Sequence, residues 1–340
     1  MPQPTAGDVF VSPALTTVSL AFYQDQSVYI ADKMFPLVRV NLQAGIVWEW
    51  DLQYILINGM EPRAEGAESR GIGNKLNQKT YFAPVLALHK DISDQRRANE
   101  VSVLADGSIV QGAINADRSA TTLLTSQAVQ KREITLKAAA FKTSLWTGQT
   151  DQVGVSGTPS TNQFKQWDQA SSDPIADITK QCSNIQLATG VRPKRMAMGQ
   201  QVWDALKTNP AILDRLKFFG VPGQATQVTE AAVAALFGLD EILVSGTVQG
   251  TSNEGGTLTT GYVIGKEYVL FSTPPAPDID TPSAGYTFVW TGYTGANSYG
   301  ARVKKFRMEH LAADRIEIEQ AYDQRPLSTT LGGYASSVVG

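Results

Sequence analysis

The sequence predicts an α+β fold with several extended parts, and three observations carry this prediction. Two strand-like segments enclose a long charged loop within residues 45–89. A helical pattern without Gly or Pro runs from about residue 117 to 146. Helices and strands then alternate over residues 171–273, and strand patterns dominate after that block.

Composition and charge narrow the class of protein. The 340 residues suffice for two domains, or for one domain with large excursions. The net charge of −3 argues against a protein that binds nucleic acid by neutralising phosphates. Cys182 is the single cysteine, so no intrachain disulfide forms, and a reducing compartment fits best. Without a signal-peptide pattern or a membrane-length apolar run, we expect a soluble protein that makes no membrane contact.

The N-terminal part indicates an extended chain. Residues 1–27 are rich in Pro, Thr, Ser and Gln, which is typical of an arm that orders only against a surface. Residues 28–44 have a mostly strand-like pattern and join this arm to the next strand. Alternation then places Trp48 and Trp50 on one face of that strand.

A long hairpin follows from the next segments. Residues 58–78 are rich in Gly, Glu and Arg and have no helical or strand period, and a second strand pattern covers residues 79–89. Structureless loops longer than about 12 to 15 residues are uncommon inside compact domains. We therefore expect the loop at the tip of this hairpin to have a partner.

The long helical pattern predicts a spine for the fold. Asp117 is a candidate N-cap, and apolar residues recur at near-helical spacing as far as about Trp146. A helix of about thirty residues is roughly 45 Å long. A Gly/Ser/Thr/Pro-rich linker at residues 148–160 separates it from the alternating block, where Asp173 and Pro174 begin a helix that has Cys182 on its buried face.

The segments that resemble enzyme or cofactor-binding motifs lack the neighbouring residues and elements that such sites need. His89 and His310 have no second ligand at metal-binding spacing, and "GIGNKL" neither follows a strand nor opens a helix. Asp278 and Asp280 lie in a Pro-rich loop, where carboxylates are usually solvated. We expect no catalytic residue, no metal and no cofactor, and we predict a protein that is not an enzyme.

The order of arm, hairpin, long helix, α/β block and final strands resembles the major capsid proteins of tailed bacteriophages. These proteins have the Hong Kong 97 type of capsid fold, which encapsulins share. The order and spacing of the segments are more specific than any one of them. The resemblance is carried by "YIADKMFPLVRV", "IVWEWD", "TYFAPVLALHKDISDQRRANE", "MAMGQQVWDALKTNPAILDRLK", "LFGLDEILVSG" and "GYTFVW".

The resemblance implies a division into named parts. It makes the hairpin an extended loop, the E-loop, that reaches across a neighbouring subunit. It also implies a peripheral P-domain, which contains the spine helix, and an axial A-domain at the centre of each capsomer. The parts are the N-terminal arm at 1–27, the joining segment at 28–44, the E-loop at 45–89, the P-domain at 91–160 and 274–326, the A-domain at 171–273 and a C-terminal tail at 327–340.

By the same resemblance, the function is that of a structural subunit. Hexamers and pentamers of the chain would close into an icosahedral shell around the double-stranded DNA of a tailed phage, in the virion and, during assembly, in the host cytoplasm. The expected partners are other copies of the chain, a portal protein, a decoration protein and, where one is needed, a separate scaffolding protein. Contact with packaged DNA is expected to be weak and non-specific.

Candidate assembly residues lie in the hairpin. The tryptophans are expected to brace it and the charged residues to form ion pairs between subunits, setting register more than strength, since an exposed pair contributes only about 0 to 1 kcal/mol. The candidates are Trp48, Trp50, Arg63, Glu65, Glu68 and Arg70. Some capsid proteins cross-link a loop lysine to an asparagine; Lys75 and Lys79 lie in this region, although solvated lysines are the simpler interpretation.

Three alternatives stay open on the sequence alone. An encapsulin-like shell would have the same fold and house a cargo enzyme instead of a genome. A hydrolase would have its α/β core at residues 171–246 and a β-rich accessory domain, and the two histidines make it less favoured. A tail component would be β-rich, which the long helix argues against.

Overall fold

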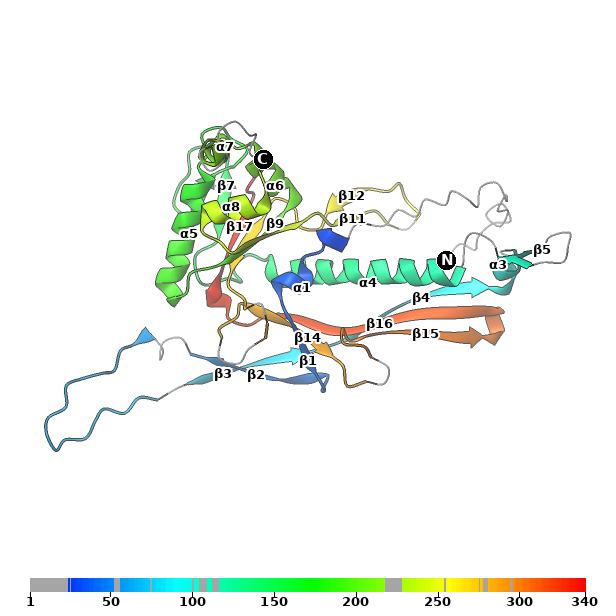
Figure 1. The fold of residues 1–340 in the computed structure, drawn as a ribbon, viewed down its shortest axis with the longest axis horizontal. Coiled ribbons are helices and arrows are strands. Elements are labelled where there is room, and N and C mark those ends of the chain that lie inside the picture. Colours follow the sequence, from blue (N-terminus) through cyan, green and yellow to red (C-terminus); the bar gives the residue numbers. More distant parts are fainter. Residues whose placement is uncertain are drawn as a thin grey trace.

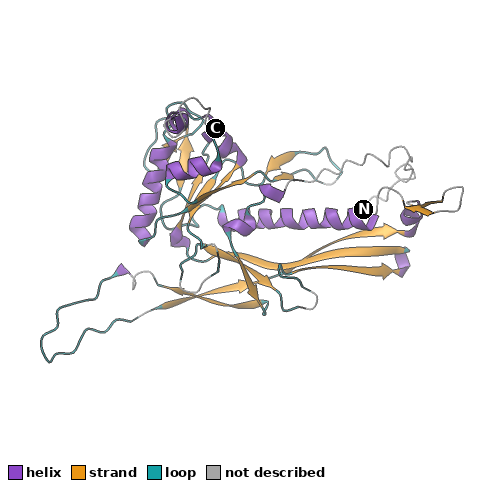
Figure 2. Cartoon of the chain, in the orientation of Figure 1, coloured by secondary structure: helices purple, strands orange, loops and turns teal. Residues whose placement is uncertain are grey.

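The computed structural model describes residues 24, 26–51, 56–73, 75–99, 101–103, 109–111, 116–217, 228–253, 255–274, 276–277, 281–293 and 296–340. A long layer of one helix and several strands carries a block of shorter elements at one end, and a two-stranded hairpin reaches out from below that block (Figure 1). Most of the helices gather in the block, whereas the hairpin and the long layer consist mainly of strands (Figure 2). No helix within the described ranges is long and apolar enough to cross a membrane.

The long layer is built around β16 (Ala313–Pro326). It pairs with β4 (Val85–Ser93) on one side and β15 (Ala301–Met308) on the other, both antiparallel, and then with β14 (Gly285–Trp290), which pairs with β1 (Leu37–Val40). Helix α4 (Ala116–Ala140) lies along one face of these strands. The core between them consists of Ile92, Ile316 and Ile318 from the strands and Ala116, Ala120 and Leu124 from the helix.

The predicted spine helix is present but shorter than expected. It ends at Ala140, whereas the sequence predicted an end near Trp146. Trp146 is buried and its indole N–H donates to the Ala140 carbonyl at 2.7 Å, so the chain turns back over the last turn of the helix. Asp117 lies inside the first turn and is therefore not the N-cap.

The block at the end contains a six-stranded sheet with strand order β10-β9-β13-β17-β7-β8. Helices α5 (Pro174–Thr189), α6 (Gln200–Thr208), α7 (Pro210–Lys217) and α8 (Glu230–Phe237) accompany it. Asp173 caps α5 by accepting from the amides of Ile175 and Ala176, and Gly190 ends the helix in the left-handed conformation. The strands are β7 (Gln152–Val155), β8 (Gln163–Lys165), β9 (Arg195–Gly199), β10 (Glu241–Ser245), β13 (Tyr268–Phe271) and β17 (Gly332–Ser336).

Two segments predicted to lie outside the sheets are strands of this block. The linker predicted at 148–160 contains β7, and the tail predicted at 327–340 contains β17, which lies between β13 and β7. Gly332 makes the tight packing possible, because a Cβ there would lie 2.3 Å from the Trp146 ring. The segment predicted as a tail therefore contributes one central strand, residues 332–336, to this sheet.

The N-terminal segment is less extended than the sequence predicted. Residues 28–44 contain the strand β1 and the first residue of the next strand, and β1 is preceded by η2 (Gln26–Val28) and the short helix α1 (Ala31–Met34). Ala31 and Met34 are buried, so packing against the core favours a helical turn over a strand here. The predicted arm at 1–27 lies almost entirely outside the described residues.

The hairpin consists of β2 (Ala44–Trp50) and β3 (Leu76–Phe82), paired antiparallel. The second strand predicted at 79–89 divides after Phe82, and its continuation leaves the hairpin to join β16 as β4. Pro84 lies at this break, where its missing N–H ends the ladder. The remaining elements are α3 (Asp94–Asn99), β5 (Val101–Val103), β6 (Ile109–Gln111), β11 (Val248–Gly250), β12 (Thr260–Tyr262), η3 (Glu309–Leu311) and η4 (Thr329–Leu331).

Candidate assembly surfaces

The hairpin has an inner face that is fixed to the body. Residues opposite each other in an antiparallel pair share a face, which groups Val47 and Glu49 with Lys79 and Tyr81. The Tyr81 ring stacks on Phe288, and the Lys79 ammonium lies 2.8 Å from the Glu49 carboxylate and donates to the carbonyl of residue 327. The base of the hairpin is therefore anchored to the long sheet.

The outer face of the hairpin is apolar and exposed. Ile46, Trp48, Leu76 and Phe82 are each between 43% and 55% exposed, with Trp48 at 55%. The register places Trp50 opposite Leu76 along the same ladder. Contiguous exposed apolar side chains on an extended element are typical of surfaces that become buried on association.

The tip of the hairpin extends well beyond the body (Figure 1). Its apolar side chains are exposed as well, most of all Met60 at 91%. The predicted assembly residues Arg63, Glu65, Glu68 and Arg70 are all exposed. Arg70 pairs with Glu61, and no other ion pair involves these four residues within the described part of the chain. The predicted pairing between subunits stays a prediction.

The two loop lysines differ in environment. Lys75 is exposed at the end of the tip, directly before β3. Lys79 is half-buried and interacts with Glu49 and with a backbone carbonyl. Lys79 therefore holds the hairpin base in place. The sequence did not reveal this, because the partners of Lys79 lie 30 and 248 residues away along the chain.

The opposite end of the long layer carries a distal ion-pair cluster. Arg97 bridges Asp117 and Asp314, and Arg307 makes two hydrogen bonds of 2.6 Å to Asp94. The hydrogen bond from Arg97 holds the pKa of the Asp314 carboxyl below its ordinary value, and Arg307 does the same for Asp94. The cluster ties α3 and the start of α4 to the strands. Its members are Asp94, Arg97, Asp117, Lys305, Arg307 and Asp314.

The residues considered for chemistry do not form a metal-binding group in the described part of the chain. No group of three His, Cys, Asp or Glu side chains suited to a metal ion occurs among the described residues. His89 and His310 both lie close enough to Asp91 to help lower the pKa of its carboxyl, with Arg315 the main cause. Cys182 is fully buried, and this burial raises the pKa of its thiol. Asp278 and Asp280 lie outside the described residues.

Comparisons with known proteins bear on the class. Residues 156–257, which run through α5 to α8 and beyond, match the family described as phage major capsid protein E. A crystal structure of a phage-related protein from Bordetella bronchiseptica RB50 is 19% identical over 96% of this chain and 97% of that one, with a TM-score of 0.64. The capsid of cyanophage P-SCSP1u is 12% identical over 98% and 92%, with a TM-score of 0.58. No curated protein sequence matches the chain.

A third structure extends the comparison to encapsulins. The holo-SrpI encapsulin complex from Synechococcus elongatus is 10% identical over 96% of this chain and 95% of that one, with a TM-score of 0.54. At these identities the structural matches establish the fold, so the chain has the Hong Kong 97 type capsid fold that the sequence predicted. The family match over residues 156–257 is a similarity to phage major capsid proteins, and the predicted resemblance is confirmed. Together they support a structural shell subunit.

Proposed function

We propose that this chain is the major capsid protein of a tailed phage, with hexamers and pentamers forming an icosahedral shell around double-stranded DNA. The observation that carries the proposal is the hairpin, in a chain with this fold. Its inner face is anchored through Tyr81 and Lys79, while its outer face presents Ile46 and Trp48 to solvent. An isolated subunit gains nothing from such a surface, whereas an assembled one buries it.

The assembly mechanism follows from this asymmetry. The hairpin of one subunit contacts a different surface on the next, so the contact is heterologous and closes into rings when the rotation allows. In a closed shell several neighbours hold each subunit, which raises the effective concentration for every further contact. In these terms β2 and β3 with the tip form the E-loop, α4 with the long sheet forms the P-domain, and the six-stranded block forms the A-domain.

The loop charges and Trp48 are assigned supporting roles. Arg63, Glu65 and Glu68 are exposed and are proposed to pair with charges on a neighbouring subunit. Arg70 already has Glu61 as a partner within the chain, so its contribution is to shape the tip. Trp48 is proposed to pack on the neighbour, because its side chain points away from the subunit that carries it.

The partners and the location complete the proposal. A portal protein, a separate scaffolding protein and a decoration protein fit a shell of this type. The net charge of −3 supports only weak, non-specific contact with packaged DNA. The protein acts as a building unit without catalysis, in the virion capsid and, before that, in the host cytoplasm.

Electron microscopy with light scattering on the purified chain at rising concentration tests the proposal. Closed polyhedral particles, or capsomers that convert to them, are the expected result. A monomer that stays dispersed even when the scaffolding partner is co-expressed would remove the shell function. The contents of the particles also distinguish the phage capsid from a second candidate function, an encapsulin-like cargo shell, which the fold similarity to the SrpI encapsulin favours. Nuclease-protected DNA inside them supports the phage capsid, and a dedicated cargo protein supports the cargo shell.

A further inference from the structure

A buried carboxyl on the spine helix joins three separate parts of the fold. Glu133 lies on α4 and is 0% exposed. Its carboxylate accepts hydrogen bonds from the amides of Ile30 and Ala31, at 3.2 and 3.0 Å, and from the Ser245 hydroxyl at 2.8 Å. Ser245 is the last residue of β10. One side chain therefore connects the N-terminal segment, the spine helix and the edge of the six-stranded sheet.

The segment that Glu133 holds has a second, independent contact with α4. The guanidinium of Arg132, the preceding residue, lies 3.2 Å from Asp32 of the segment and over the Tyr322 ring of β16. Ile30, Ala31, Met34 and Phe35 of the segment are buried in the same core cluster as the end of α4. We call residues 26–35 the N-terminal latch.

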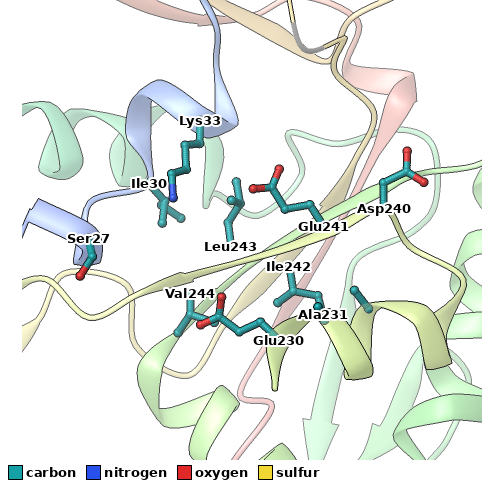
Figure 3. A pocket seen from close by; sticks show the side chains of 11 residues that line it. Ser27, Ile30, Lys33, Glu230, Ala231, Asp240, Glu241, Ile242, Leu243 and Val244 are labelled. Atoms are coloured by element: carbon teal, nitrogen blue, oxygen red, sulfur yellow. The ribbon is translucent and has the colours of Figure 1, made fainter. Parts of the chain in front are cut away.

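No cation neutralises the Glu133 carboxylate among the described residues. Tyr29 and Asp32 of the latch interact with it electrostatically. Arg132 precedes it on α4, and Lys33 and Glu241 line the pocket that Ile30 also lines. Arg132 is directed to Asp32, and Glu241 pairs with Arg195 at 3.3 Å. Lys33 points into a pocket of about 220 Å³ between the latch, β10 and α8, where Glu241 also lies (Figure 3).

This environment sets the protonation of the carboxyl. Burial raises the pKa of Glu133 to about 7, against the opposing effect of the hydrogen bonds from Ser245, Ile30 and Ala31, and the charge of Asp32 raises it further. Three donors satisfy the ionised form, but the site offers no counter-charge. The carboxyl therefore changes its charge close to neutral pH while it remains at the junction of the three elements.

We propose that the N-terminal latch is a pH-sensitive device, whose docking onto α4 and β10 weakens when Glu133 loses its proton. In the docked state the buried carboxyl prefers to be neutral, and once the latch opens it regains water and its ordinary acidity. The inference does not rest on the capsid function, because it concerns the attachment of a segment within one chain. For a shell subunit it would couple the release of the N-terminal region to the pH of the surroundings.

The direction of the effect follows from linkage. The docked pKa of about 7 lies above the ordinary value of 4.5, so the contribution of Glu133 to docking is complete below pH 4.5. It is lost as pH rises through 7. Over the full range the opening equilibrium constant of the latch rises about 300-fold, and between pH 5.5 and 8.5 it rises about 30-fold.

Amide hydrogen exchange at Ile30 and Ala31 tests the proposal on the full-length, unassembled protein. Protection is measured at pH 5.5 and 8.5 and corrected for the intrinsic rates. We expect it to fall about 30-fold in the unmodified protein. It should stay constant in Glu133→Gln, which remains neutral and still offers an acceptor to the amides and a donor to the Ser245 hydroxyl. The amide of Leu270, in the buried strand β13, is an internal reference that should show no such change.

Two further variants keep the test decisive. Asp32→Asn removes a negative neighbour and should move the midpoint of the transition to lower pH. Ser245→Ala removes a donor that favours the ionised carboxyl and should move the midpoint to higher pH. This shift is the deciding measurement if Glu133→Gln does not fold. Equal protection at both pH values in the unmodified protein would overturn the proposal. So would the same pH dependence in Glu133→Gln, or a midpoint that neither neighbouring variant moves.

Discussion

The rings of Tyr81 and Phe288 stack with their centroids 4.6 Å apart and their planes inclined by 13°. Tyr81 lies on β3 of the hairpin and Phe288 on β14 of the long sheet, so this contact joins the protruding element to the body. Val47 and Leu327 pack against the same cluster. The hairpin is therefore a fixed extension with one free face.

Removing the Tyr81 ring should loosen this attachment. Tyr81→Ala deletes a buried aromatic side chain and is expected to lower the free energy of unfolding by about 3 kcal/mol, measured by urea denaturation. Tyr81→Phe is the matched control, because it keeps the stacked ring and loses only a hydrogen bond of 3.3 Å to the Leu42 carbonyl. It should cost no more than about 1 kcal/mol. Equal losses in the two variants would show that stacking does not fix the hairpin.

The exposed face of the hairpin should matter for assembly and not for folding. Trp48→Ser removes a side chain that is already 55% exposed, so the stability of the subunit should change by less than about 0.5 kcal/mol. If the ring becomes buried on a neighbour, its loss should raise the concentration needed for assembly at least tenfold, since each 1.4 kcal/mol corresponds to a factor of ten.

Leu258→Ser is the control for this experiment. Leu258 is 73% exposed but lies between β11 and β12, away from the hairpin. Light scattering against concentration should show an unchanged assembly threshold for this variant. An equal effect of both substitutions would mean that general surface polarity, and not the hairpin face, governs association.

The distal ion-pair cluster should make the fold sensitive to acid. The pKa values of Asp94 and Asp314 are lowered by hydrogen bonds from Arg307 and Arg97, so their contribution is present above the ordinary value of 3.8. It is lost as pH falls through the lowered values. The urea midpoint of the double variant Asp94→Asn/Asp314→Asn should lie below that of the unmodified protein at pH 6, and the difference should shrink toward pH 3. A difference that stays constant with pH would contradict the assignment.

Local patterns in the sequence predicted the elements whose signals are local. The Asp173 cap, the Gly190 stop of α5 and the alternation that puts Trp48 on one face of β2 are each written within a few neighbouring residues. The hairpin and the uninterrupted spine helix followed from the length of their patterns. These features, taken in order, were sufficient to indicate the capsid fold.

The missed features depend on contacts between distant residues. β7 and β17 have four and five residues, include Gly, and pair with each other across more than 170 positions, so neither segment alternates clearly enough to indicate a strand. The inner face of the hairpin was hidden for the same reason, because Lys79 meets its carbonyl partner 248 residues away. Glu133 carries no sequence signal at all, since burial inside a polar-looking helix is decided by what packs against it.

The position of β17 leads to a prediction about the C-terminal end. Deleting residues 332–340 would remove the strand between β13 and β7 and the buried side chains of Tyr334 and Val338. It would also expose two strand edges that are now paired, so the six-stranded block should lose its cooperative unfolding transition and the chain should aggregate on expression. Replacing residues 63–68 of the exposed tip by Gly and Ser changes a stretch that has no buried side chain and should leave the urea transition unchanged. A truncated chain that unfolds like the full-length protein would mean that β17 contributes little to the sheet, as expected for the tail that the sequence predicted.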